Sequence, residues 1–228
     1  AANSHEFLVE NDPGGRKDWT AVAADFLQLA RHKTIYDQVR FLDITGRERV
    51  RVNFNGGNPA VVPEKDLQFK GRRYYFLDAI GLERGRIFVS PFDLNVERGE
   101  IETPLKPMVR FATPVFDCGL NKVGLMILNY LGSDLLGLVE RLAEGVPGDV
   151  MLLNTDGYWL RGIDPADEWG FMYENRGEFT FPNRFPNAWE SLRRADSGQF
   201  TVASGFLPSA TLYPMQAGLA SAGATAAP

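Results

Sequence analysis

The spacing of apolar residues predicts two amphipathic helices. The first runs from about Asp18 to about Lys33, because its large apolar side chains recur three or four positions apart and Asp18 is a residue type that caps helices. The second begins at Ser133 or Asp134 and ends near Glu144, before a cluster of glycine and proline that stops helices. Its apolar face consists of Leu135, Leu138, Val139 and Leu142.

Alternation of polar and apolar positions predicts three β-hairpins. They are expected at residues 39–54, 108–130 and 150–161. We expect the first hairpin to expose one face to water, because Arg49 and Arg51 alternate with valines. The remaining expected elements are one or two short helices within 66–80, a strand at 86–90, a loop at 91–107, short helices at 168–173 and 188–195, and a strand at 199–203.

Two segments of the chain repeat one pattern. Residues 39–46 and 150–157 both follow an amphipathic helix, and both read as a strand that ends in a turn with an acidic or amide residue and a glycine. Any two hairpins with such turns look alike, which is the simpler interpretation. We favour duplication of an α+β module of about 100 residues, which fits the chain length.

The duplication predicts a division of the chain into a lead helix, two modules and a tail. The predicted boundaries are 1–35, 36–131, 132–214 and 215–228. The second module is expected to lack a final strand comparable to residues 123–130, which suggests a segment cut from a longer chain. The tail is rich in alanine, glycine, serine and threonine, and is expected to be frayed.

Composition excludes several classes of function. A net charge of −5 argues against binding to nucleic acid, and the single cysteine, Cys118, excludes an internal disulfide. His5 and His32 are too few for a histidine-rich metal site, so we expect no metal and no cofactor. No nucleophile motif or phosphate loop is present, which makes a hydrolase the weaker hypothesis. The chain shows no signal peptide and no membrane-spanning run, so we expect a cytosolic protein or a soluble piece of a larger one.

Cationic, aromatic and amide side chains are concentrated in the first module. Arg110 lies between Val109 and Phe111 in a predicted strand, so its side chain points to the opposite face from both. Such side chains can hold a carboxylate and the polar groups of a small solute. The simpler interpretation is that the arginines are solvated and the tyrosines belong to the core. The candidate ligand-binding residues are Arg72, Arg73, Tyr75, Ser90, Asp93, Asn95, Arg110 and Asn129.

Several blocks of the sequence, in order, carry a resemblance to a known family. They are residues 36–52, 70–76, 90–97, 107–115 and 124–129. Together they resemble the tandem PAS-like (double Cache) extracytoplasmic sensor domains of bacterial sensor histidine kinases and diguanylate cyclases. The resemblance covers about residues 17–205, densely in the first module and thinly in the second.

The resemblance implies an α+β fold of two PAS-like modules, each with a central antiparallel sheet flanked by helices. It implies the periplasmic part of an inner-membrane receptor, whose membrane-distal module binds a small polar metabolite and whose cytoplasmic part carries a kinase or cyclase. This part itself is not expected to be an enzyme. A homodimer through the N-terminal helix is a further expectation. A protein-interaction module without a small ligand and a chemoreceptor sensor domain are the alternatives.

The chain departs from the family pattern at Asn129. Relatives that bind amino acids carry an aspartate at the end of the last distal strand, where it holds the ammonium group of the ligand. The neutral amide of Asn129 lacks that charge, which disfavours a free amino acid as the ligand; an organic acid, a different polar metabolite or no ligand at all fits as well.

Overall fold

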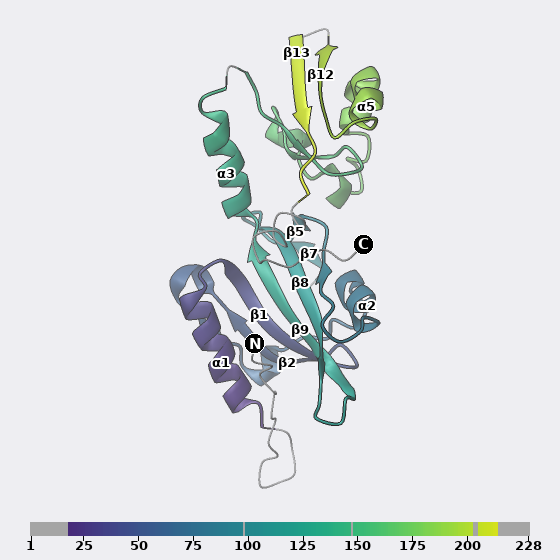
Figure 1. The fold of residues 1–228 in the computed structure, drawn as a ribbon. Helices are drawn as coiled ribbons and strands as arrows, with labels where there is room; N and C mark the ends of the chain where they lie inside the picture. Colours follow the sequence, from purple (N-terminus) through teal and green to yellow (C-terminus); the bar gives the residue numbers. More distant parts are fainter. Residues whose placement is uncertain (1–17, 98, 147, 203–204, 214–228) are drawn as a thin grey trace. The chain divides into compact units, whose positions relative to one another are not determined.

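The computed structural model describes residues 18–97, 99–146, 148–202 and 205–213. They form two compact units that divide between Gly148 and Asp149 (Figure 1). The predicted tail at 215–228, and the part of the lead segment before residue 18, lie outside the described residues. Because the division follows residue 148, the helix at Ser133–Ala143 falls in the first unit.

The first unit is built on a seven-stranded antiparallel sheet. The strand order is β3-β2-β1-β9-β8-β4, and β5 also pairs with β8, at Pro107 and Met108. The strands of this sheet are β1 (Tyr36–Asp43), β2 (Glu48–Asn53), β3 (Ala60–Val61), β4 (Phe88–Val89), β5 (Asp93–Leu94), β8 (Pro107–Phe116) and β9 (Lys122–Leu131). Two further strands, β6 (Val96–Glu97) and β7 (Glu100–Ile101), pair with each other. This confirms the α+β fold class and the central antiparallel sheet.

Two helices cover opposite faces of this sheet. Helix α1 (Thr20–His32) packs on β1 and β2, and helix α2 (Tyr74–Ile80) packs on β8 and β9 (Figure 1). Neighbouring residues of β1 divide accordingly, since Phe41 joins the core under α1 and Leu42 joins the core under α2. Burial of such apolar side chains contributes roughly 1.5–3 kcal/mol each.

The prediction that the first hairpin exposes Arg49 and Arg51 on one face is correct for Arg49 and wrong for Arg51. Within β2, Glu48 and Arg51 are buried and Arg49 is exposed, where it pairs with Asp43 at 2.7 Å. Arg51, which alternates with the valines, therefore faces a second buried layer, whereas Arg49 faces water. Alternation of charged and apolar residues distinguishes the two faces of a strand, but it does not show which face meets water.

Three other local predictions need correction. Helix α2 begins at Tyr74, so the two arginines before it precede the helix, and Arg73 has an extended backbone. The predicted strand at 86–90 shortens to β4, while the predicted loop at 91–107 contains β5, β6 and β7. Helix α1 takes Trp19 as its N-cap, although the Asp18 carboxylate still accepts a hydrogen bond from the Thr20 backbone. Helix α3 (Ser133–Ala143) forms where predicted but buries none of its residues.

The second unit contains two separate pairs of antiparallel strands. The pairs are β10 (Leu152–Leu153) with β11 (Trp159–Arg161), and β12 (Ser197–Val202) with β13 (Gly205–Ala210). The expected central sheet is therefore divided among the described residues, and β13 is a late strand that the sequence analysis missed. Helices α4 (Phe181–Arg184) and α5 (Pro186–Leu192) complete a core around Trp159 and Phe181. Short 3-10 turns occur at 55–57 and 64–66 in the first unit, and at 165–167 and 170–172 in the second.

The two repeated turns have the same hydrogen-bond pattern. Gly46 donates its backbone N–H to the Asp43 carbonyl at 2.9 Å, and Gly157 donates to the Asn154 carbonyl at 3.1 Å. The side-chain oxygens of Asp43 and Asn154 each accept backbone N–H groups two and four residues ahead. Both glycines have a φ of +85°. The repeat seen in the sequence is therefore also a repeat of local structure.

We predict that Gly46→Ala strongly destabilises the first unit. The positive φ disfavours any Cβ, and that Cβ would lie 2.2 Å from the Cα of Gly71. Steric overlap and the left-handed conformation together should lower the free energy of unfolding by about 2–5 kcal/mol, measured by urea denaturation. Gly56→Ala is the matched control, because Gly56 also has a positive φ but open space around it. Equal losses in the two variants would contradict the steric explanation.

Candidate functional site

A row of polar side chains crosses four strands on the sheet face that carries α2. Asn53 is opposite Gln38, Gln38 is opposite Asn129, and Asn129 is opposite Arg110 in the strand register. Directly opposite residues project from the same face of a sheet. Arg40 and its partner Arg51 extend this polar surface by a second row. We call these six residues the polar face.

Arg40 connects β1 to the neighbouring strands. Its Nη2 donates to Oδ1 of Asn129 at 2.6 Å, and its Nη1 lies 3.5 Å from Oε1 of Glu48. The Asn129 amide then donates to Oε1 of Gln38 at 3.2 Å. The Arg40 side chain is 2% exposed, and the buried charge is compensated by these partners.

Arg110 organises the segment around β5. Its guanidinium donates to the carboxylate of Asp93 and, at 3.2 Å, to Oδ1 of Asn95. Its backbone N–H donates to the hydroxyl of Ser90 at 2.8 Å. The second oxygen of Asp93 accepts a hydrogen bond from the Tyr74 hydroxyl at 2.6 Å. Burial and the neighbouring Asp93 raise the pKa of Tyr74, which keeps the phenol protonated.

The ring of Tyr75 lies at the centre of three guanidinium groups. The guanidinium carbons of Arg110, Arg40 and Arg73 lie 5.3, 5.5 and 6.0 Å from the ring centroid. A tyrosine face attracts cations in this range, more strongly when the cation is desolvated. Tyr75 is 2% exposed, so helix α2 covers the polar face with this ring.

Five buried side-chain atoms lack a hydrogen-bond partner among the described residues. They are Nε of Arg40, Nε of Arg51, Nε of Arg110, Oδ1 of Asn53 and Oε1 of Glu48. Four of them belong to the polar face, and the fifth belongs to Glu48, which forms ion pairs with Arg40 and Arg51. Buried polar atoms are almost always satisfied, so their concentration here indicates a place for polar groups from elsewhere.

The structure brings seven of the eight predicted ligand-binding residues together. Arg110 contacts Ser90, Asp93 and Asn95, while Asn129 contacts Arg40. Tyr75 and Arg73 join through their ring contact. The remaining predicted residue, Arg72, is exposed and forms no ion pair or hydrogen bond through its side chain in the described part of the chain.

Sequence reasoning missed four residues of the polar face, and Tyr74 beside it; the four are Gln38, Arg40, Arg51 and Asn53. Arg40 could have been found, because it lies between Val39 and Phe41 just as Arg110 lies between Val109 and Phe111. The link between Arg40 and Asn129 joins residues 89 positions apart, and no local pattern reveals such a contact.

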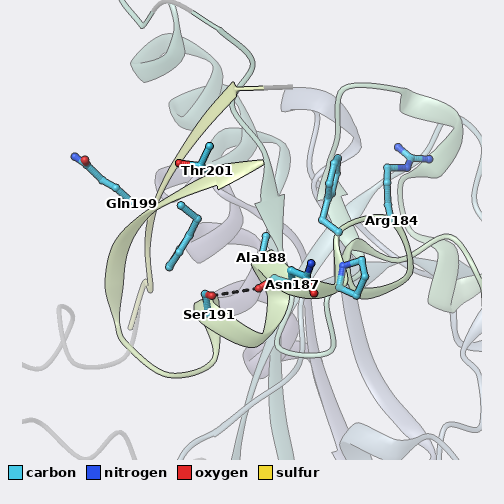
Figure 2. A pocket seen from close by; sticks show the side chains of 9 residues that line it. Arg184, Asn187, Ala188, Ser191, Gln199 and Thr201 are labelled. Atoms are coloured by element: carbon cyan, nitrogen blue, oxygen red, sulfur yellow. Dashed lines mark hydrogen bonds between the residues drawn. The ribbon is translucent and has the colours of Figure 1, made fainter. Parts of the chain in front are cut away.

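The second unit has a groove between α5 and β12. It holds about 550 Å³ and is lined by Arg184, Phe185, Pro186, Asn187, Ala188, Ser191, Gln199, Phe200 and Thr201 (Figure 2). Arg184 is the one charged residue of this lining, and it is already paired with Asp167 at 2.7 Å. Figure 2 shows the side chain of Gln199 pointing away from α5. The groove therefore has no converging charged groups, and the polar face is the better candidate site.

The described residues offer neither a metal-binding cluster nor a membrane-spanning helix. No group of three or more His, Cys, Asp or Glu side chains is placed to hold a metal ion there. None of the helices in that part of the chain combines the length and apolar character needed to cross a membrane.

The fold is similar to solved sensory domains. A domain of a putative sensory box/GGDEF family protein from Vibrio parahaemolyticus has 24% identity and a TM-score of 0.69, over 81% of this chain and 69% of that chain. The extracellular domain of the putative histidine kinase vpHK1S-Z8 has 24% identity and a TM-score of 0.68, over 81% and 65%. The chain thus spans about two-thirds of the length of each of these chains.

A third similar structure contains a small ligand. The ligand-binding domain of the Campylobacter jejuni chemoreceptor Tlp3, in complex with 4-methylisoleucine, has 11% identity and a TM-score of 0.50, over 79% of this chain and 62% of that chain. At these identities the likeness shows the fold alone. No curated protein matches the chain by sequence.

The sequence matches the family described as bacterial histidine kinase, sensor domain, over residues 6–207. This match covers most of the chain and confirms the resemblance to extracytoplasmic sensor domains. The chain therefore belongs to the family of bacterial histidine kinase sensor domains.

Proposed function

We propose that this sensor domain binds a small organic acid on the polar face of its first unit. The observation that carries this proposal is the group of five buried atoms that lack a hydrogen-bond partner. Three of these atoms are arginine Nε–H groups, which need acceptors. A carboxylate supplies four acceptor positions and pairs with guanidinium in planar geometry. The domain itself is not catalytic.

The electrostatics of the site support an anionic ligand. Burial alone would raise the pKa of Glu97, which lies beside the polar face. The Lys70 ammonium, the hydrogen bond from Gln38 and the charge of Arg40 instead lower this pKa to about 2. The surroundings of Gln38 therefore stabilise negative charge.

The hydrogen bonds of Asn129 support an organic acid, and not an amino acid, as the ligand. Its carbonyl oxygen accepts from Arg40 and its amide nitrogen donates to Gln38, so both ends of the side chain are engaged. The buried carboxylate of Asp93 is engaged by Arg110 and Tyr74. A ligand ammonium group would have to compete with Arg110 for Asp93.

The setting of the domain is part of the same proposal. We infer that it is the periplasmic part of an inner-membrane receptor with a cytoplasmic kinase or cyclase, and that ligand binding shifts the population of its conformations. Membership of the histidine kinase sensor family supports a kinase output. The ligand present in the similar Tlp3 domain supports small-molecule sensing. A homodimer through the N-terminal helix remains part of this proposal.

A different observation favours the alternative, a sensory module that binds a protein and no small ligand. On helix α3, Leu138 is 45% exposed and Leu142 is 69% exposed, although the helix has an apolar face. Exposed apolar surface of this kind is typical of protein-interaction sites. Failure of every small acid to bind would favour this alternative.

We predict that Arg73→Ala abolishes ligand-induced stabilisation. Arg73 is half-buried beside Tyr75, and its guanidinium has no ion pair in the described residues, so its removal should leave the fold intact. A thermal-shift screen of succinate, citrate and related acids supplies the measurement. A ligand at a hundredfold excess over Kd stabilises by about 2.7 kcal/mol, which corresponds to roughly 5–10 °C for a unit of this size.

Arg72→Ala is the matched control for this screen, because Arg72 is the exposed neighbour of Arg73. The shift should survive in Arg72→Ala and vanish in Arg73→Ala. A shift of the same size in both variants would mean that Arg73 does not hold the ligand. If no acid changes the melting temperature of the unmodified domain, the proposed ligand class loses its support.

We predict that Glu97 makes stability depend on acid pH. Its folded pKa of about 2 lies below its ordinary value of 4.5, so its stabilising effect is complete above pH 4.5 and is lost as pH falls toward 2. The unfolding free energy of Glu97→Gln should fall below that of the unmodified domain by on the order of 2 kcal/mol at pH 7, and the two values should converge only as pH falls to about 2. Urea denaturation across this range tests this, with exposed Glu100→Gln as control. If the unfolding free energies of the two proteins differ by the same amount at every pH, the charge of Glu97 is not the cause of the lost stability.

A further inference from the structure

The carboxylate of Glu97 is bound by donors from other segments of the first unit. Its Oε1 accepts from Nε2 of Gln38 at 3.3 Å, and its Oε2 accepts from Nε2 of Gln68 at 3.2 Å. Nζ of Lys70 lies 3.6 Å from the same Oε2. Two amides and one ammonium thus surround one carboxylate, which is a typical set of partners for an anion.

These donors are positioned by contacts that do not involve Glu97. The amide of Asn129 holds Oε1 of Gln38, which leaves the NH₂ group of Gln38 to donate. The backbone N–H of Gln68 donates to Oε2 of Glu48 at 2.9 Å. The backbone of Lys70 donates to the Gly46 carbonyl at 2.7 Å, and Lys70 is 6% exposed. The donor set is therefore preorganised, which lowers the cost of binding any carboxylate there.

The strand that carries Glu97 contacts the sheet through polar side chains, next to the backbone hydrogen bond from Asn95 to the Lys106 carbonyl at 2.8 Å. In the part of the chain that the structure describes, β6 pairs with β7 and with no strand of the seven-stranded sheet. Asn95, just before β6, contacts Arg110, while Glu97 itself contacts Gln38. Gln38 belongs to the polar face, so the Glu97 position is continuous with the proposed ligand site.

We propose that Glu97 is an internal anion that occupies a carboxylate-binding position and competes for it with the sensed acid. The competition rests on the proposed function, whereas the carboxylate-binding position does not. A dicarboxylate is the ligand class that fits, with one carboxylate on the arginines of the polar face and the other replacing Glu97 on Lys70 and Gln38. Ligand binding then releases β6 from the polar face, which links occupancy to a change in conformation.

Chemical rescue of Glu97→Ala tests the carboxylate-binding position. Removal of the carboxylate leaves Lys70 buried without its ion pair, so the melting temperature should fall by roughly 5 °C. About 0.1 M sodium acetate should restore at least half of this loss relative to sodium chloride at equal ionic strength. Acetate should have no such effect on the unmodified domain or on Glu100→Ala, in which an exposed glutamate of β7 is removed. Adding Lys70→Met to Glu97→Ala should abolish the rescue.

Equal effects of acetate and chloride on Glu97→Ala would overturn the proposal. If that variant does not fold, Glu97→Gln replaces it, because it keeps the size of the side chain and removes the charge. Succinate should then raise the melting temperature of Glu97→Gln more than that of the unmodified domain, and equal shifts would overturn the competition. Acetate rescue needs no sensed ligand, so it can succeed even if the acid screen on the unmodified domain fails.

Discussion

Two arginines buried on one face of a sheet impose the main constraint on the first unit. Arg40 and Arg110 are each 2% exposed, and burying a cation costs several kcal/mol unless partners compensate it. The compensation comes from Glu48 for Arg40 and from Asp93 for Arg110. Asp93 is in β5, so its ion pair with Arg110 also holds the chain that follows β4 against the sheet.

The two faces of the sheet contribute differently to the domain. The face under α1 is apolar and stabilises the unit by burying Phe26 and Phe41. The face under α2 is apolar at Leu125 and Ile127 and polar at Asn129, so one strand passes from core to candidate site within five residues. The second unit repeats the turn chemistry of the first, but its groove lacks a comparable set of buried charges. These differences are the reason why the proposed ligand site lies in the first unit.

The predictable part of the structure was local. Helix α1, the hairpin of β8 and β9 and the two repeated glycine turns formed close to their predicted positions, because each depends on spacing within about twenty residues. Two of the six residues of the polar face, Arg110 and Asn129, were also predicted, since each has a distinctive position in a predicted strand. Arg40 was missed although its position is equivalent, and Glu97 was missed because a loop shows no periodicity.

By itself, the sequence determined the α+β class, the alternation of strand faces and the position of the acidic-glycine turns. These features follow from residue size, polarity and backbone freedom, which act over a few neighbouring positions. The tertiary structure alone decided that Glu48 and Arg51 of the first hairpin are buried, that Arg40 contacts Asn129, and that the Glu97 carboxylate contacts Lys70. Such contacts depend on strand register and on pairing between distant segments, and their energies arise only when burial lowers the local dielectric constant.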